Sequence, residues 1–260
     1  MTAPVVARRQ HGILAGPTYS RSPSNSSMCE ILVVSWPEER PFIDIQAQVG
    51  DLERLGMGGF GWGVAWLTDE GVARVRGLGR YVDEALNDPR LARARSSRFL
   101  VHLRRPNRLS TISMFDTQPF VAGREYAWCH NGFFTGAERL RPIYSARLKG
   151  AADSEVGWAY FQEQLAAGLT PEQAMRRVDR SLGGSMNLAY LSSDGTLMVY
   201  SRNVTNPMWT FRVGDAAMAS TCVHSDDGSL FDLIFPTALE RRRLIPGTGA
   251  FVGKLRSATA

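Results

Sequence analysis

The order of apolar and polar positions along the chain predicts a protein rich in β-strands. Continuous apolar runs at 31–34 and 64–67 are typical of strands buried on both faces, and the run at 98–103 reads the same way. Tight turns are expected at Asn131-Gly132 and Asp194-Gly195. Further strands are expected at 126–131, 186–191, 197–201 and 208–213.

Two helices are predicted in the middle of the chain. Asp153 can cap a helix that runs to Ala167 and stops at Gly168. A second helix is expected over 171–182, because Thr170 and Gln173 form a capping-box pattern around a proline at the first helical position. A short helical end is expected near 238–243. Strands on either side of two central helices indicate a layered α+β or α/β protein.

The composition is that of one globular domain preceded by a leader. The chain has 260 residues, of which 44% are apolar and 21% charged, enough to bury a large core. Residues 1–28 are rich in Ser, Pro and Ala and contain three arginines but no acid, so we expect them to lie outside the fold. They resemble an organelle transit peptide in composition, without its amphipathic helical period. The domain is predicted to span 29–260.

Charge and cysteine content exclude several classes of function. Without the leader the chain is near neutral and has no basic stripe, so nucleic acid is not an expected partner. No apolar run reaches the roughly 18 residues of a membrane span. Three cysteines with no CxxC pair indicate a reducing compartment, and we expect a cytoplasmic protein.

Neither a metal nor a cofactor is expected. The four histidines are too far apart in the sequence for a local metal motif. The segment GMGGFGWG at 56–63 lacks the helix and the acidic residue of a dinucleotide site, and is more typical of a turn where backbones approach closely.

Five short motifs carry the candidate chemistry. Taken singly, each suggests something ordinary: a buried thiol, a turn or a helix cap. In chain order they are Met28-Cys29, His102-Leu103-Arg104, Gln118-Pro119-Phe120, His130-Asn131-Gly132 and Asp153-Ser154-Glu155. In that order and spacing, the chain resembles the class II glutamine amidotransferases, which are N-terminal-nucleophile hydrolases. The likeness runs from Met28 to about the C-terminus and is strongest to stand-alone bacterial members, which include the ergothioneine-pathway hydrolase of γ-glutamyl conjugates.

The resemblance implies a fold and an activity. The fold is a four-layer αββα sandwich, with two stacked, mostly antiparallel sheets and helices outside, the predicted helices at 154–167 and 171–182 forming one cover. The activity is hydrolysis of the γ-glutamyl amide of glutamine or of a γ-glutamyl conjugate, through a cysteine thioester. Glutamate is released with ammonia or an amine. The partner is a small-molecule substrate, and a synthetase partner or a homodimer remains open.

The resemblance also assigns roles to residues. Cys29 is the nucleophile, and its own α-amino group, with a reference pKa of about 7.7–8.0, is the base. Asn131 and Gly132 supply the oxyanion donors. The resemblance also implies three substrate-binding residues. Arg104 binds the α-carboxylate, Asp153 binds the α-ammonium, and His130 is the third.

The chain departs from the family pattern in two ways. Cys29 is internal, so a free α-amine requires that residues 1–28 be a propeptide or an incorrectly assigned start. If they are retained, the chain is a catalytically silent binding or regulatory subunit. The family commonly has Asn and His where this chain has Asp116 and Gln118, so a different substrate preference is expected. Cys129 and Cys222 are predicted to be core thiols.

Overall fold

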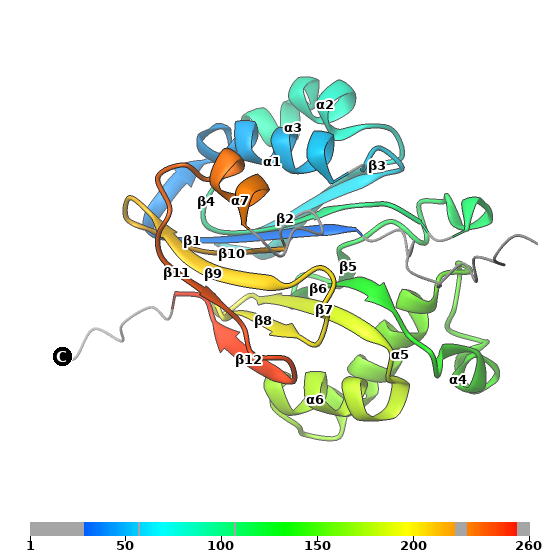
Figure 1. Cartoon of the computed structure of the whole chain (residues 1–260). Coiled ribbons are helices and arrows are strands. Elements are labelled where there is room, and N and C mark those ends of the chain that lie inside the picture. Colours follow the sequence, from blue (N-terminus) through cyan, green and yellow to red (C-terminus); the bar gives the residue numbers. More distant parts are fainter. Residues whose placement is uncertain (1–28, 57, 107, 222–227, 254–260) are drawn as a thin grey trace, which may run out of the picture.

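Two antiparallel β-sheets lie face to face in the middle of the molecule, and helices cover their outer faces (Figure 1). The computed structural model describes residues 29–56, 58–106, 108–221 and 228–253. The first sheet has the strand order β11 (Leu239–Arg243), β9 (Met208–Val213), β10 (Ala216–Thr221), β1 (Glu30–Pro41), β4 (Arg95–Leu103), β2 (Trp62–Thr68) and β3 (Gly71–Gly77). The second has the order β12 (Thr248–Phe251), β8 (Leu197–Ser201), β7 (Ser185–Ser192), β6 (Tyr126–Phe133) and β5 (Phe120–Ala122).

The helices form the two outer layers (Figure 1). Those over the first sheet are α1 (Ile43–Leu55), α2 (Tyr81–Glu84), α3 (Pro89–Ala92) and α7 (Ser229–Ile234). Those on the side of the second sheet are α4 (Ala137–Tyr144), α5 (Asp153–Ala166) and α6 (Pro171–Leu182). Short 3₁₀ turns occupy Ala85–Asn87 and Leu109–Thr111. The expected four-layer α+β sandwich is therefore confirmed. Among the described residues, no helix is both long and apolar enough to cross a bilayer.

Strand β1 shows why its apolar run is continuous. Successive side chains of a strand point to opposite faces. Leu32 and Val34 belong to the core beneath α1, whereas Ile31 and Val33 belong to the core between the two sheets. A strand covered on both faces must be apolar at every position. A third core fills the space between the second sheet and α4, α5 and α6.

The helices of the second cover begin and end close to the expected places. Helix α6 has the full capping box, in which the Thr170 side chain accepts from the Gln173 backbone and Gln173 returns the bond. Helix α5 ends before Gly168, which has a φ of +86°. Its start differs slightly from the prediction: Ala152 is the N-cap, and Asp153 lies in the first turn. The Asp153 side chain does not cap the helix and instead accepts hydrogen bonds from the N–H groups of Phe134 and Ser154.

Two sequence-based predictions were wrong. Asn131 and Gly132 do not form a turn, because β6 continues to Phe133 and pairs with β7 through both residues. The segment 238–243 is not helical but forms edge strand β11, which pairs with β9. Helices α1 and α7 and strands β3 and β10 were not predicted.

Other predictions concern single residues. Cys129 is fully buried between the sheets, which confirms it as a core thiol. The glycine-rich segment does allow close approach, since a Cβ on Gly63 would lie 2.2 Å from the carbonyl oxygen of Gln118. Residues 1–28 and Cys222 lie outside the described residues.

Candidate active site

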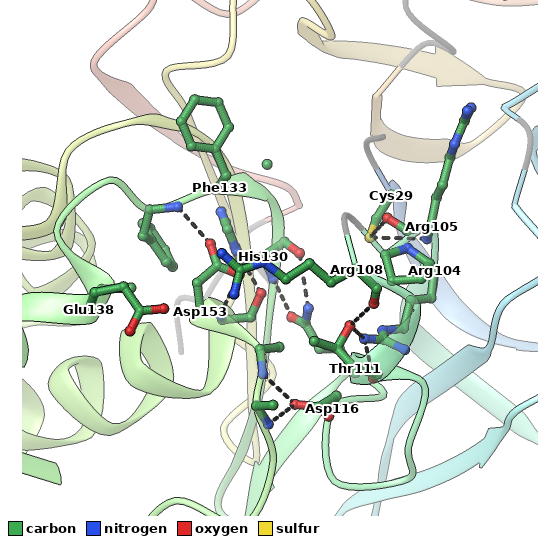
Figure 2. Close-up of a pocket in the computed structure, with 18 residues that line it drawn as sticks. Cys29, Arg104, Arg105, Arg108, Thr111, Asp116, His130, Phe133, Glu138 and Asp153 are labelled. Atoms are coloured by element: carbon green, nitrogen blue, oxygen red, sulfur yellow. Dashed lines mark hydrogen bonds between the residues drawn. The ribbon is translucent and has the colours of Figure 1, made fainter. Parts of the chain in front are cut away.

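A cavity of about 410 Å³ opens where β1 begins, where β4 and β6 end, and near the start of α5 (Figure 2). Cys29 precedes β1 and Arg104 follows β4, and these two strands are antiparallel neighbours in which Glu30 pairs with Leu103. That register places Cys29 next to Arg104, although 75 positions separate them in the chain. Gly132 and Asp153 line the same cavity. The two sheets and α5 therefore bring together residues from four distant motifs.

The thiol of Cys29 is partly buried, and its hydrogen bonds within the described residues go to the backbone of Arg105. The Arg105 N–H donates to Sγ at 3.3 Å, and Sγ lies 3.7 Å from the Arg105 carbonyl oxygen. Burial raises the pKa of this thiol to about 11, against the lowering effects of the Arg105 N–H and the Arg104 charge. The thiol is protonated at neutral pH in this state, so nucleophilic attack requires a base.

No histidine of the described chain is placed to act as that base. His130 lines the cavity, but its Nδ1 is bonded to Ser154 Oγ at 2.9 Å and its Nε2 has no hydrogen-bond partner. The fully buried His102 bonds through Nε2 to the His130 carbonyl oxygen at 3.2 Å. Burial lowers the pKa of each imidazole to about 3, so both rings are neutral at pH 7.

Asn131 lies against the main chain of Cys29. Its Nδ2 donates to the Cys29 carbonyl oxygen, and its Oδ1 accepts from Nδ2 of Asn187 at 2.7 Å. Asn206 Nδ2 also lies 3.4 Å from the same carbonyl oxygen and 3.3 Å from the Glu30 carboxylate. Asn131 is fully buried and is not among the residues that line the cavity. The side-chain amide of Asn131 therefore positions the main chain of Cys29 without lining the cavity.

Sequence reasoning did not identify Asn187 and Asn206 as part of this network. Asn187 is directly opposite Asn131 in the β6–β7 register. It interrupts an otherwise largely apolar buried strand, and a buried polar side chain needs partners. The polar residue within this apolar strand was the sequence signal that could have identified Asn187.

Gly132 is the one position of this wall that requires glycine. Its φ is +129°, and a Cβ would lie 2.0 Å from the Ser185 carbonyl oxygen. No L-residue with a side chain fits there. Its backbone forms part of the cavity wall.

Arg104 presents an unused donor to the cavity. Nη2 is anchored by the Thr111 carbonyl oxygen at 2.6 Å and by Thr111 Oγ1 at 2.8 Å. Nη1 is buried and has no protein partner. Burial also lowers the pKa of the guanidinium, which disfavours an unpaired charge there. An anionic ligand would supply the missing acceptor.

Asp153 is held at the start of α5 with its carboxylate at the cavity. Oδ2 accepts from the Phe134 N–H at 2.7 Å and Oδ1 from the Ser154 N–H at 2.9 Å. Burial raises its pKa, and these backbone donors oppose the rise. The carboxylate is thus fixed in direction and can still accept from a ligand ammonium.

The two departures from the family pattern have structural roles. Asp116 Oδ1 accepts from the N–H groups of Ala151 and Ala152 at 2.8 and 2.7 Å and so positions the turn before Asp153. Gln118 bonds to both the N–H and the carbonyl oxygen of His130. Both residues line the cavity, and these hydrogen bonds hold other parts of the protein.

A metal centre would need several ligands close together. Among the described residues, no group of three or more His, Cys, Asp or Glu side chains is placed to hold a metal ion. Arg105 and Arg108 also line the cavity, and sequence reasoning did not select them. In Figure 2 the Arg108 side chain extends across the cavity toward His130.

Comparison by sequence finds no relative. No protein-family model matches the chain, and no curated protein matches it.

Comparison by structure does find relatives. Glutamine phosphoribosylpyrophosphate amidotransferase from B. subtilis, solved with ADP and GMP, matches with a TM-score of 0.67 and 19% identity over 86% of this chain and 47% of that one. The allosteric regulatory enzyme of purine biosynthesis matches with a TM-score of 0.68 and 18% identity, over 86% of this chain and 46% of that one. A glutamine aminotransferase class-II domain protein from Silicibacter pomeroyi matches with a TM-score of 0.55 and 18% identity, over 85% and 93%.

These likenesses establish the fold. The chain spans about half the length of the first two enzymes and nearly all of the third. The sandwich is the one seen in class II glutamine amidotransferases, as the order of motifs predicted.

Proposed function

We propose that this protein hydrolyses the γ-glutamyl amide bond of glutamine or of a γ-glutamyl conjugate, through a thioester on Cys29. One observation carries the proposal. The thiol of Cys29, the unpaired Nη1 of Arg104 and the carboxylate of Asp153 surround a single cavity in a class II amidotransferase fold. These groups match a nucleophile and the two charges needed to hold an amino acid.

The head group of a glutamyl substrate explains the pair of opposite charges. Its α-carboxylate can accept from Nη1 of Arg104, which the fold leaves without a partner. Its α-ammonium can donate to Asp153, whose carboxylate is already oriented by two backbone N–H groups. Fixing both charged groups of the head directs the γ-carbonyl toward Cys29 and removes much of the entropy cost of attack.

The base in this proposal is the α-amino group of Cys29. A thiol with a pKa near 11 is a poor nucleophile until its proton is taken. Removal of residues 1–28 creates an amine on the same residue, with a reference pKa of about 7.7–8.0. This amine can accept the thiol proton directly or through one water.

The reaction then proceeds in two steps. The thiolate attacks the γ-carbonyl carbon, and the Gly132 N–H at the cavity wall stabilises the oxyanion. Asn131, whose amide donates to the Cys29 carbonyl, positions the nucleophile. The tetrahedral adduct expels ammonia or an amine, which takes the proton from the α-ammonium of Cys29. Water then hydrolyses the thioester, releases glutamate and restores the thiol.

The compartment and partners belong to the same proposal. Cys29 and Cys129 are free thiols, which agrees with a reducing, cytoplasmic compartment. A separate synthetase could accept the ammonia. The bonds made by Asp116 and Gln118 suggest that they influence substrate choice by positioning Asp153 and His130.

The test compares two forms of the protein. One is the chain of 260 residues, and the other begins at Cys29; intact mass and N-terminal sequencing establish which start each form has. Glutamate and ammonia release is measured from glutamine and from a set of γ-glutamyl amides. Turnover should occur only when Cys29 is the first residue, and the Cys29→Ala variant should be inactive.

Two results would contradict the proposal. Turnover by Cys29→Ala would remove the nucleophile assignment. An inert chain beginning at Cys29 would instead favour the alternative, a silent binding or regulatory subunit. Equilibrium binding of glutamate to that chain then tests whether the head-group site is intact.

A further inference from the structure

A second cavity, of about 300 Å³, lies beside β3 and β5, the edge strands of the two sheets, and next to α5. Arg74 and Arg76 project into it from β3, and Arg147 and Lys149 come from the segment between α4 and α5. Its lining also includes three aromatic residues, Phe115, Phe120 and Trp158. The cavity thus combines four cationic side chains with three aromatic rings.

The four cations are not neutralised by acidic side chains. Within the described residues, none of them forms a salt bridge. Their hydrogen bonds go to neutral oxygens: Arg74 Nη1 to Pro119 at 3.0 Å, Arg76 Nη1 to Met114 at 2.7 Å, and Arg147 Nη2 to Gln162 Oε1 at 3.0 Å.

Glu155 is the only acid that lines the cavity. Its two carboxylate oxygens accept from the backbone N–H groups of Lys149 and Gly150, each at 2.7 Å. Those bonds use the carboxylate to fix the main chain, and it makes no salt bridge to the arginines in the described part of the chain. The cavity therefore keeps a net positive charge.

Two of the cations are half-buried and close to each other. Burial and, to a smaller extent, the charge of Arg76 together lower the pKa of Arg74 to about 10. Charged groups removed from water are normally paired. An anion bound between Arg74 and Arg76 would relieve both the desolvation and the repulsion.

We propose that this cavity binds a small dianion attached to a flat apolar ring, the chemistry of an aryl or nucleoside monophosphate. Guanidinium groups match phosphate oxygens in a two-pronged geometry, and Phe115, which is 55% exposed, offers a surface for a ring. The volume is at the lower end of the roughly 300–1,000 Å³ range of small-molecule sites. This site is distinct from the cavity at Cys29 and is tested by binding, without reference to the proposed activity.

Hydrogen bonds link the second cavity to the first through the segment around Asp116 and the segment just before Asp153. Arg76 donates to the carbonyl oxygens of Met114 and Thr117, on either side of Asp116. Asp116 in turn holds the amides that precede Asp153. A phosphate that draws Arg76 away from those carbonyls would displace Asp116. Ligand binding in the second cavity should therefore alter the candidate active site.

The experiment is calorimetric titration of the full chain with phenyl phosphate. We expect saturable binding with a Kd below about 1 mM. Arg147→Gln combined with Lys149→Gln should weaken it by about tenfold or more, and so should Arg74→Gln. Both residues of the first pair are in exposed positions, so the double substitution should have little effect on folding. Arg177→Gln with Arg180→Gln removes two exposed charges from α6 and should change the Kd less than about twofold.

Several outcomes would overturn the proposal. One is the absence of saturable binding up to about 10 mM phenyl phosphate. Another is an equal loss of phenyl phosphate affinity in the α6 control variant. A third is equal affinity for inorganic phosphate, which would exclude a role for the rings. Loss of binding in Arg108→Gln alone would assign the ligand to the other cavity. Saturating phenyl phosphate should also change the rate of Cys29 alkylation by about twofold or more; an unchanged rate would overturn the communication between the cavities.

Discussion

The side-chain amide of Gln118 pairs with both main-chain polar groups of His130, accepting from its N–H at 2.6 Å through Oε1 and donating to its carbonyl oxygen at 3.1 Å through Nε2. Both residues are buried. The same carbonyl also bonds to Nε2 of His102 at 3.2 Å. Gln118 therefore fixes the strand just before Asn131 and Gly132.

Gln118→Leu should destabilise the protein. It leaves the buried His130 N–H without an acceptor, whereas the carbonyl keeps its bond to His102. The expected loss in the free energy of unfolding is about 1–3 kcal/mol, measured by urea denaturation. Gln164→Leu, on a partly exposed position of α5, is the control and should change it by less than about 0.5 kcal/mol. Equal effects of the two would refute this pairing role.

Gly132→Ala should disrupt the cavity wall. The added Cβ would meet the Ser185 backbone at 2.0 Å, with a φ of +129°. A loss of more than about 3 kcal/mol, or failure to fold, is expected in thermal or urea unfolding. Gly123→Ala also has a positive φ, +54°, but meets nothing within 4 Å, so it should cost only about 1 kcal/mol. Similar losses in both variants would mean that backbone conformation, not contact with Ser185, is the constraint.

Arg104→Gln should weaken substrate use if Arg104 binds the α-carboxylate. The change removes the free Nη1 donor and the charge. Loss of one partner of a buried charge pair costs about 2–5 kcal/mol, so kcat/KM for a γ-glutamyl amide should fall by about 30-fold or more. Arg93→Gln, on an exposed arginine at the end of α3, is the control and should leave it unchanged. A normal kcat/KM in Arg104→Gln would contradict the assignment.

The alkylation of Cys29 should depend on pH and on the chain start. A pKa of about 11 in the full chain means that the thiolate fraction at pH 7 is about 10⁻⁴ and rises about tenfold per pH unit up to that pKa. Iodoacetamide labelling, followed at Cys29 by peptide mass spectrometry, should follow this slope. In the chain that begins at Cys29, the nearby amine should speed labelling near neutral pH. Cys129, fully buried with its pKa also raised, provides the internal control and should stay unlabelled.

The sequence by itself determined the elements whose signals are local. The capping box of Thr170 and Gln173 fixed the start of α6, and the apolar run of β1 required a strand buried on both faces. The order of the motifs indicated the four-layer sandwich, which the structural relatives confirm. It also selected Cys29, Arg104, Gly132 and Asp153, all of which line one cavity.

Tertiary structure decided what depends on pairing between distant strands. LERRR at 239–243 has no apolar face to distinguish helix from strand, and pairing with β9 makes it β11. The turn expected at Asn131-Gly132 does not form, because β7 offers partners for both residues. The β6–β7 register also places Asn187 opposite Asn131, so that Asn187 donates to Asn131 and Asn131 donates to the Cys29 carbonyl oxygen. Register is set by long-range burial and hydrogen bonding, which the local sequence does not encode.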